Sequence, residues 1–209
     1  MVDATHPHEH SGEHDGGHDG HRTGGLDAMA VSATLHCLTG CAIGEIAGML
    51  IGTAAGLANG PTIAISIVLA FVFGYTLSTL PLLKAGLALG AALSIVLAAD
   101  TLSIATMEVV DNIVVAVIPG AMDAGLVNVV FWISLMISLV AAFVAAFPVN
   151  RFLLRRGKGH ALTHEYHHAA PEATGARRFI PSFSTASLVA VIVAFLLGGL
   201  VVSIADALG

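Results

Sequence analysis

The chain has few charged residues. They make up 11% of its 209 residues, whereas hydrophobic residues make up 56%. A typical soluble domain has about 25% charged residues. The eight lysines and arginines are also too few to form a strongly basic domain, so we expect no nucleic-acid partner. The composition predicts an integral membrane protein whose first partner is the lipid bilayer.

Cysteine is scarce as well, because the chain contains only Cys37 and Cys41. Two cysteines exclude a framework of several disulfides. On one regular helix, side chains four residues apart have Cβ atoms about 5–6 Å apart. A disulfide requires Cβ atoms about 3.5–4.5 Å apart. We therefore interpret both residues as free thiols.

Sequence motifs of secretion and catalysis are missing. The first 27 residues are polar and rich in histidine, without the apolar segment of a secretory signal. No nucleophile triad, phosphate-binding glycine loop or dinucleotide-binding fingerprint occurs, because the glycine repeats fall inside apolar runs. We expect no catalytic residues and no enzyme activity.

Five apolar runs are long enough for a helix to cross a bilayer, which takes about 20 residues. They predict an all-α polytopic membrane bundle. The expected spans are 28–57, 62–83, 85–118, 121–150 and 184–207, with a long hydrophilic loop at 151–183. The third run becomes polar after Ala99, so a span followed by a short re-entrant segment is the alternative to one long helix.

Glycine recurs at every fourth residue of the first run, at Gly40, Gly44, Gly48, Gly52 and Gly56. A glycine inside a helix costs about 1 kcal/mol relative to alanine. A stripe of glycines on a membrane helix is typical of close backbone packing against a neighbouring helix. We therefore expect the first span to be the central helix of the bundle.

Basic residues predict the orientation, because cytoplasmic loops carry an excess of lysine and arginine. With five spans and the 151–183 loop in the cytoplasm, Arg22, Lys84 and all basic residues of the loop lie on one side. This pattern predicts a multi-pass protein of the cell membrane, inner or plasma, with a cytoplasmic N-terminus and an external C-terminus.

The first span carries groups that are costly in lipid, within the sequence HCLTGCAIGE of residues 36–45. Cys37, Cys41 and Glu45 step by four residues and form a ridge on nearly one side of a helix, and His36 lies about 100° round from Cys37. Ionisable groups at this depth usually face a bundle interior or a water-filled path. Thiolates select soft ions such as copper(I), and imidazole and carboxylate suit zinc or nickel. The sequence therefore predicts a transition-metal site at these four residues.

A structural interpretation of the same residues is the alternative. Cysteine packs well as a small hydrophobic residue. His36 and Glu45 would then hydrogen-bond to another helix of the bundle.

Residues 1–27 form a polar tail with six histidines among aspartate, glutamate and glycine. A segment with so few apolar residues cannot build a core, so we expect it to be disordered. Closely spaced imidazoles and carboxylates bind zinc, nickel or copper(II). The tail is therefore expected to buffer metal, and a solubilising leader or part of a tag is the alternative.

The hydrophilic loop contains a second group of histidines, at His160, His164, His167 and His168. Spacings of four and three residues place the first three on one face of a helix, where two imidazoles can share one ion. The alternative is a basic segment whose arginines bind anionic lipid. The two roles are compatible.

Three acids of the third run, Asp100, Glu108 and Asp111, also lie on roughly one side of a helix. Unpaired carboxylates on the outer side would concentrate cations at a mouth. Solvated residues at a helix end explain the same pattern, and this is the preferred interpretation.

Two stretches, HCLTGCAIGE in the first span and NRFLLRRGKGHALTHEYHH after the fourth, carry a family resemblance. The chain resembles a family of small prokaryotic integral membrane proteins known only as a domain of unknown function. The resemblance would cover residues 28–209. It implies a polytopic membrane protein with its chemistry at His36, Cys37, Cys41 and the loop histidines, and it implies no activity.

Transport or handling of a transition-metal cation is the first functional hypothesis, with a copper, zinc or nickel ion as the only expected cofactor. The expected partners are that ion, a metallochaperone and further copies of the chain in a homo-oligomer. The alternatives are a membrane factor for thiol redox chemistry or metal-site assembly, and a structural membrane subunit without transport.

Overall fold

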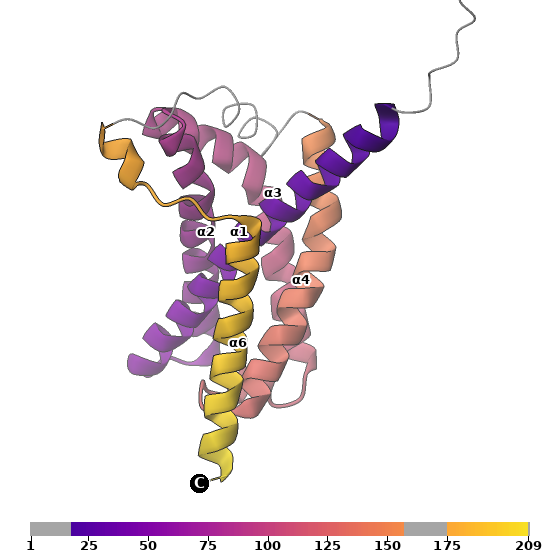
Figure 1. The fold of residues 1–209 in the computed structure, drawn as a ribbon. Coiled ribbons are helices and arrows are strands. Elements are labelled where there is room, and N and C mark those ends of the chain that lie inside the picture. The colour runs from indigo at the N-terminus through magenta and orange to yellow at the C-terminus, as the bar shows by residue number, and fades with distance from the viewer. Residues whose placement is uncertain (1–17, 157–174, 209) are drawn as a thin grey trace, which may run out of the picture.

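A computed structural model describes residues 18–156 and 175–208 (Figure 1). The described part is all-helical. It comprises α1 (His18–Ala54), α2 (Asn59–Lys84), α3 (Leu89–Val117), the 3₁₀ turn η1 (Ala121–Asp123), α4 (Val129–Arg155), the 3₁₀ turn η2 (Gly175–Phe179) and α6 (Thr185–Leu208). The five long helices are each long and apolar enough to cross a membrane. The predicted α-helical membrane bundle is confirmed.

Helix boundaries depend on local chemistry that apolar composition does not reveal. α1 begins at His18, ten residues before the expected span, because the apolar run marks where the chain enters the bundle and not where the helix starts. Pro61, expected in a break, lies in the first turn of α2, where its missing N–H has no partner to lose. α4 begins only at Val129, because the Asn128 side chain caps it by accepting from the Val130 N–H at 2.9 Å.

The third apolar run forms one continuous helix, α3, rather than a span with a re-entrant segment. Successive helices alternate in direction, so α1, α3 and α6 run the same way through the bundle (Figure 1). Side chains that lie on facing sides of α1 and α3 therefore meet in the same order along both helices.

α1 is the central helix, since it packs against each of the other four long helices. Its glycines face α2 at very short range. A Cβ atom added to Gly40 would lie 2.4 Å from the Gly74 Cα, and one added to Gly44 would lie 2.2 Å from the Ala70 backbone nitrogen. Gly56 does not belong to this stripe. It follows the end of the helix with a φ of +64°, a conformation that favours glycine.

Substituting Gly44 with alanine is expected to destabilise the bundle, because the new methyl group would meet the α2 backbone, which cannot move aside as a side chain can. Overpacking of this kind costs about 1–3 kcal/mol. Gly198→Ala is the matched control, because a Cβ atom there meets nothing within 4 Å. Thermal unfolding in detergent measures both variants. Equal unfolding midpoints for the two would contradict the close packing of α1 on α2.

Charge is distributed unevenly along the bundle axis. Arg151, near the end of α4, forms an ion pair with Asp27 of α1, with 2.5 Å between Nε and Oδ1. Lys84 lies at the C-terminal end of α2, which runs in the same direction as α4. Asp123 lies in η1, next to the other ends of these helices. One end of the bundle is thus basic and the other acidic.

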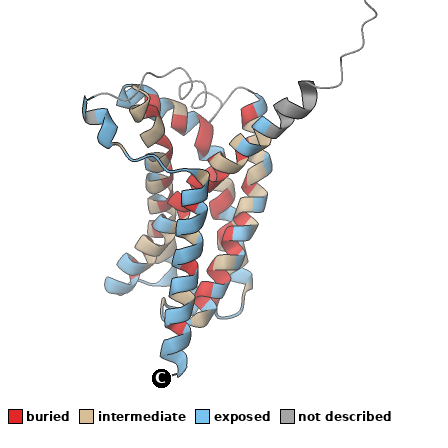
Figure 2. Ribbon diagram, viewed as in Figure 1, coloured by how far each residue is buried: buried red, intermediate tan, exposed pale blue. Residues whose placement is uncertain are grey.

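Buried residues concentrate on the inner faces of α1, α3 and α4, whereas α6 is exposed over most of its surface (Figure 2). Valine, leucine and isoleucine are frequent among the exposed side chains of the long helices. This distribution is typical of helices whose outer faces contact lipid.

Candidate functional site

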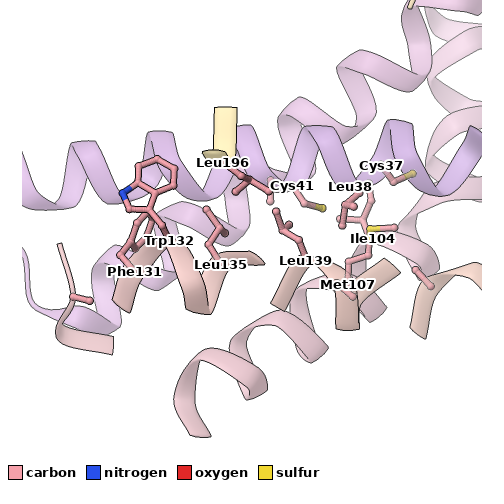
Figure 3. Close-up of a cluster of buried hydrophobic side chains, with 14 residues drawn as sticks. Cys37, Leu38, Cys41, Ile104, Met107, Phe131, Trp132, Leu135, Leu139 and Leu196 are labelled. Atoms are coloured by element: carbon pink, nitrogen blue, oxygen red, sulfur yellow. The ribbon is translucent and has the colours of Figure 1, made fainter. Parts of the chain in front are cut away.

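Both thiols of α1 point into the bundle. Cys37 is 0% and Cys41 is 1% exposed, and neither forms a disulfide. They belong to one buried cluster with Ile104 and Met107 of α3 and Leu139 of α4 (Figure 3). The ridge predicted from the four-residue spacing therefore faces protein rather than acyl chains.

The three acids of α3 are buried, with exposed fractions of 2% for Asp100, 4% for Glu108 and 6% for Asp111. The interpretation of these residues as solvated groups at a helix end is wrong. α3 continues to Val117, so Glu108 lies about 13 Å from the helix end at about 1.5 Å per residue. The acidic face of α3 turns inward, toward α1 and α4.

The α1 ridge and the α3 acids meet in three successive levels. Asp100 is a neighbour of Cys37, and Glu108 is a neighbour of Cys41. The Glu45 carboxyl group interacts with those of Asp111 and Glu108. Each thiol of α1 is thus paired with a carboxyl group of α3, and the third level consists of carboxyl groups alone.

Two of these carboxyl groups have oxygens without a hydrogen-bond partner in the described part of the chain. They are both oxygens of Glu108 and Oδ1 of Asp111. More than about 90% of buried polar groups in proteins are hydrogen-bonded, and an unsatisfied one costs about 1–3 kcal/mol. These oxygens therefore remain available to a cation or to water.

The third level, where the Glu45 and Asp111 carboxyl groups meet, opens into a cavity of about 380 Å³ at the acidic end of the bundle. Glu45, Glu108 and Asp111 line it, together with residues from α2, η1 and α4. At the same end, the Asn59 amide of α2 donates to the Asp123 carboxylate at 3.1 Å. The acids of α1 and α3 thus border space that admits water-sized molecules.

Polar contacts continue from the thiols to the basic end of the bundle. The buried Asn150 amide of α4 donates to the Thr34 hydroxyl of α1 at 2.8 Å, one helical turn before Cys37. The Arg151–Asp27 ion pair lies beyond it. We call the whole series the polar track, and its members from the basic end are Asp27, Arg151, Thr34, Asn150, Cys37, Asp100, Cys41, Glu108, Glu45 and Asp111.

Residues 28–159 match a family described as a domain of unknown function, DUF4396. The chain belongs to the DUF4396 family. The match includes both thiols, the three acids of α3 and all of α4, so the polar track from Thr34 onward lies inside it. It ends before His160 and leaves the loop histidines and α6 outside, whereas the resemblance was expected to extend to residue 209. No curated protein and no solved structure matches the chain.

His36 of this DUF4396 chain is buried but lies off the ridge. Its Nδ1 is 2.8 Å from the Ser32 backbone oxygen of the same helix. Among the side chains that the structure describes, which begin at residue 25 and exclude the 157–174 loop, no three histidine, cysteine, aspartate or glutamate side chains lie close enough to hold one metal ion. The predicted ligands of the first span, His36, Cys37, Cys41 and Glu45, are thus not gathered into a closed metal centre there.

The predicted loop ligands His160, His164, His167 and His168 lie outside the described residues, as does the N-terminal tail up to residue 17. Metal binding by these two groups of histidines stays a prediction.

Small polar residues of α2, α3 and α4 complete the site of the DUF4396 chain and were not predicted from the sequence. Ser78 and Ser103 neighbour Cys37, and Ser138 neighbours Asp111. The only sequence signal is weak: Ser103 lies three residues after Asp100 and so shares its helix face. Serine is common in membrane helices, so Ser78 and Ser138 carry no signal by themselves.

Proposed function

We propose that this DUF4396 chain moves a cation across the membrane along the polar track, and that its cargo is a transition-metal ion of the copper, zinc or nickel class. The observation that supports the proposal is the meeting of the α1 ridge with the buried acids of α3 at the edge of the cavity. Ionisable side chains at membrane depth usually mark ion pathways. Alternating thiol and carboxyl donors suit borderline and soft cations.

The arrangement of the described donors fits a path that passes a cation along better than a site that stores it. A cation pathway must bind its cargo weakly enough, at several positions, for the cargo to leave. In the described part of the chain, the thiol and carboxyl donors of the track come in successive pairs, such as Cys41 with Glu108, rather than in a closed set of three or more histidine, cysteine, aspartate or glutamate side chains. Burial of both thiols also argues against the alternative of thiol exchange with a partner protein, because the thiol of another protein cannot reach a sulfur atom inside the bundle as a small molecule in the cavity can.

The proposed orientation follows from the charge distribution. Arg151, Arg155 and Lys84 lie at the basic end, which the positive-inside rule assigns to the cytoplasm. In a cell membrane the cavity would then open to the outside, the N-terminus would be cytoplasmic and the C-terminus external. The histidines of the tail and of the loop would lie on the cytoplasmic side, where they would buffer the ion for a metallochaperone.

Flux measurements test the proposal. The full chain is reconstituted into sealed vesicles that contain a metal-sensitive fluorophore, and zinc, nickel or reduced copper is added outside. We expect at least one of these ions to enter faster than into protein-free vesicles of the same lipid. Absence of flux for all three ions, with protein that remains folded in the vesicles, would contradict the proposal.

A further inference from the structure

Buried hydroxyl groups in this bundle usually bond to their own helix. Six buried serines and threonines donate to a carbonyl three or four residues earlier, at 2.6–3.0 Å: Thr34, Thr39, Thr79, Ser134, Ser138 and Ser203. This local bond is the ordinary solution for a hydroxyl group in a membrane helix. Three buried serines depart from it: Ser66 donates instead to the Glu45 carbonyl of α1 at 3.3 Å, whereas in the described structure no such bond is formed by Ser78 or Ser103. Both are 0% exposed, and neither Oγ atom has a hydrogen-bond partner among the described residues.

Ser78 and Ser103 lie beside the same thiol. Ser78 of α2 and Ser103 of α3 are neighbours of Cys37, and Asp100, one turn before Ser103, is a third neighbour. Three helices therefore bring one sulfur and three oxygen-bearing side chains together. All four residues are at least 98% buried, so no bulk water reaches them.

We infer that Cys37, Ser78, Ser103 and Asp100 form a second, enclosed cation-binding position, one level further from the cavity than Cys41 and Glu108. The inference rests on the proposed function, because this position is the next one along the same track. The Cys37 thiolate and the Asp100 carboxylate are ligand types that zinc and cobalt(II) take, and the two serine hydroxyl groups would complete a set of four donors around the ion. The Cys37 thiol loses its proton when its sulfur binds the ion, and that proton leaves toward the water of the cavity by way of Glu108, which neighbours Cys41 and lines the cavity.

The position also has a selective role in transport. An ion in the cavity keeps most of its water, whereas an ion at Cys37 must exchange that water for protein donors. Magnesium gives up its water reluctantly, and a thiolate favours softer ions. The enclosed position therefore rejects magnesium, although the carboxyl-lined cavity admits it.

Cobalt(II) binding to the purified full chain in detergent tests the inference. Cys41→Ser serves as the background, so that Cys37 is the only thiol. We expect cobalt to produce a near-ultraviolet thiolate-to-cobalt absorption band and the visible spectrum of tetrahedral cobalt. Adding Ser78→Ala and Ser103→Ala is expected to weaken cobalt binding at least about tenfold.

Ser203→Ala is the matched control, because Ser203 is equally buried but bonds to the Leu200 carbonyl of its own helix. It is expected to leave the cobalt affinity unchanged. Thermal unfolding shows whether the serine substitutions weaken cobalt binding directly or only by destabilising the fold. Removing two unpartnered hydroxyl groups is not expected to lower the unfolding midpoint, whereas serines with a purely structural role would lower it.

Two results would overturn the inference: no thiolate band in the Cys41→Ser protein, or a cobalt affinity that the two serine substitutions leave unchanged. Neither result depends on transport. Metal flux in vesicles without cobalt binding at Cys37 would overturn the enclosed position and leave the proposed function standing. Cobalt binding at Cys37 without flux of any ion would support the position and overturn transport.

Discussion

Replacing Glu108 with glutamine is expected to slow metal flux at least about tenfold, because two unit charges 4 Å apart attract by about 4 kcal/mol at an effective dielectric constant of 20. Glu108 lines the cavity and neighbours Cys41, and neither of its oxygens has a hydrogen-bond partner in the described structure. Glutamine keeps the size of the side chain and removes its charge. Initial rates in vesicles, at equal amounts of reconstituted protein, measure the effect.

Asp206→Asn is the matched control for Glu108→Gln. It removes one carboxylate from the exposed C-terminal turn of α6, away from the cavity lining. We expect it to leave the flux unchanged. A Glu108→Gln protein that transports at the parental rate would show that the cation does not pass this carboxyl group.

Replacing both thiols with serine is expected to change which ions cross. Serine is nearly the size of cysteine, so the packing of Cys37 and Cys41 in the core is largely kept. The soft donors are lost, and oxygen donors suit harder ions such as manganese. We expect the ratio of zinc flux to manganese flux to fall about tenfold, which corresponds to about 1.4 kcal/mol.

Competition between zinc and manganese in the same vesicles measures this ratio without dependence on the amount of active protein. A ratio that stays the same in the doubly substituted protein would mean that the thiols only fill space in the core. In that case the carboxyl groups alone would carry any flux.

The sequence was sufficient for the membrane bundle and for the packing of its central helix. Long apolar runs have few alternatives to spanning helices. The glycine stripe predicted close contact, and Gly44 and Ala70 meet at backbone distance. Helix ends were predicted less well. A helix start such as that of α4 is set by one capping side chain, Asn128, whereas the spans were predicted from hydrophobicity over about 20 residues.

Burial of the acids could not be predicted from the sequence in the same way. The spacing of Asp100, Glu108 and Asp111 shows that they share a face of α3. The direction in which that face turns depends on contacts with residues of α1 such as Cys37 and Cys41, which lie more than 50 residues earlier in the chain. Periodicity reports which residues share a face and contains no information about the neighbour of that face. The roles of Ser78 and Ser103 depend on the same distant contact with Cys37.

Accessibility of Cys41 from each side of the membrane tests the central claim, that the cavity leads cations to the thiols of α1. In a Cys37→Ser protein, a small membrane-impermeant thiol reagent is added to one side of oriented vesicles at a time. We predict that Cys41 reacts faster from the side of Asp123 than from the side of Arg151, and that zinc on the Asp123 side protects it. Faster reaction from the Arg151 side, or a rate that zinc does not change, would contradict the account.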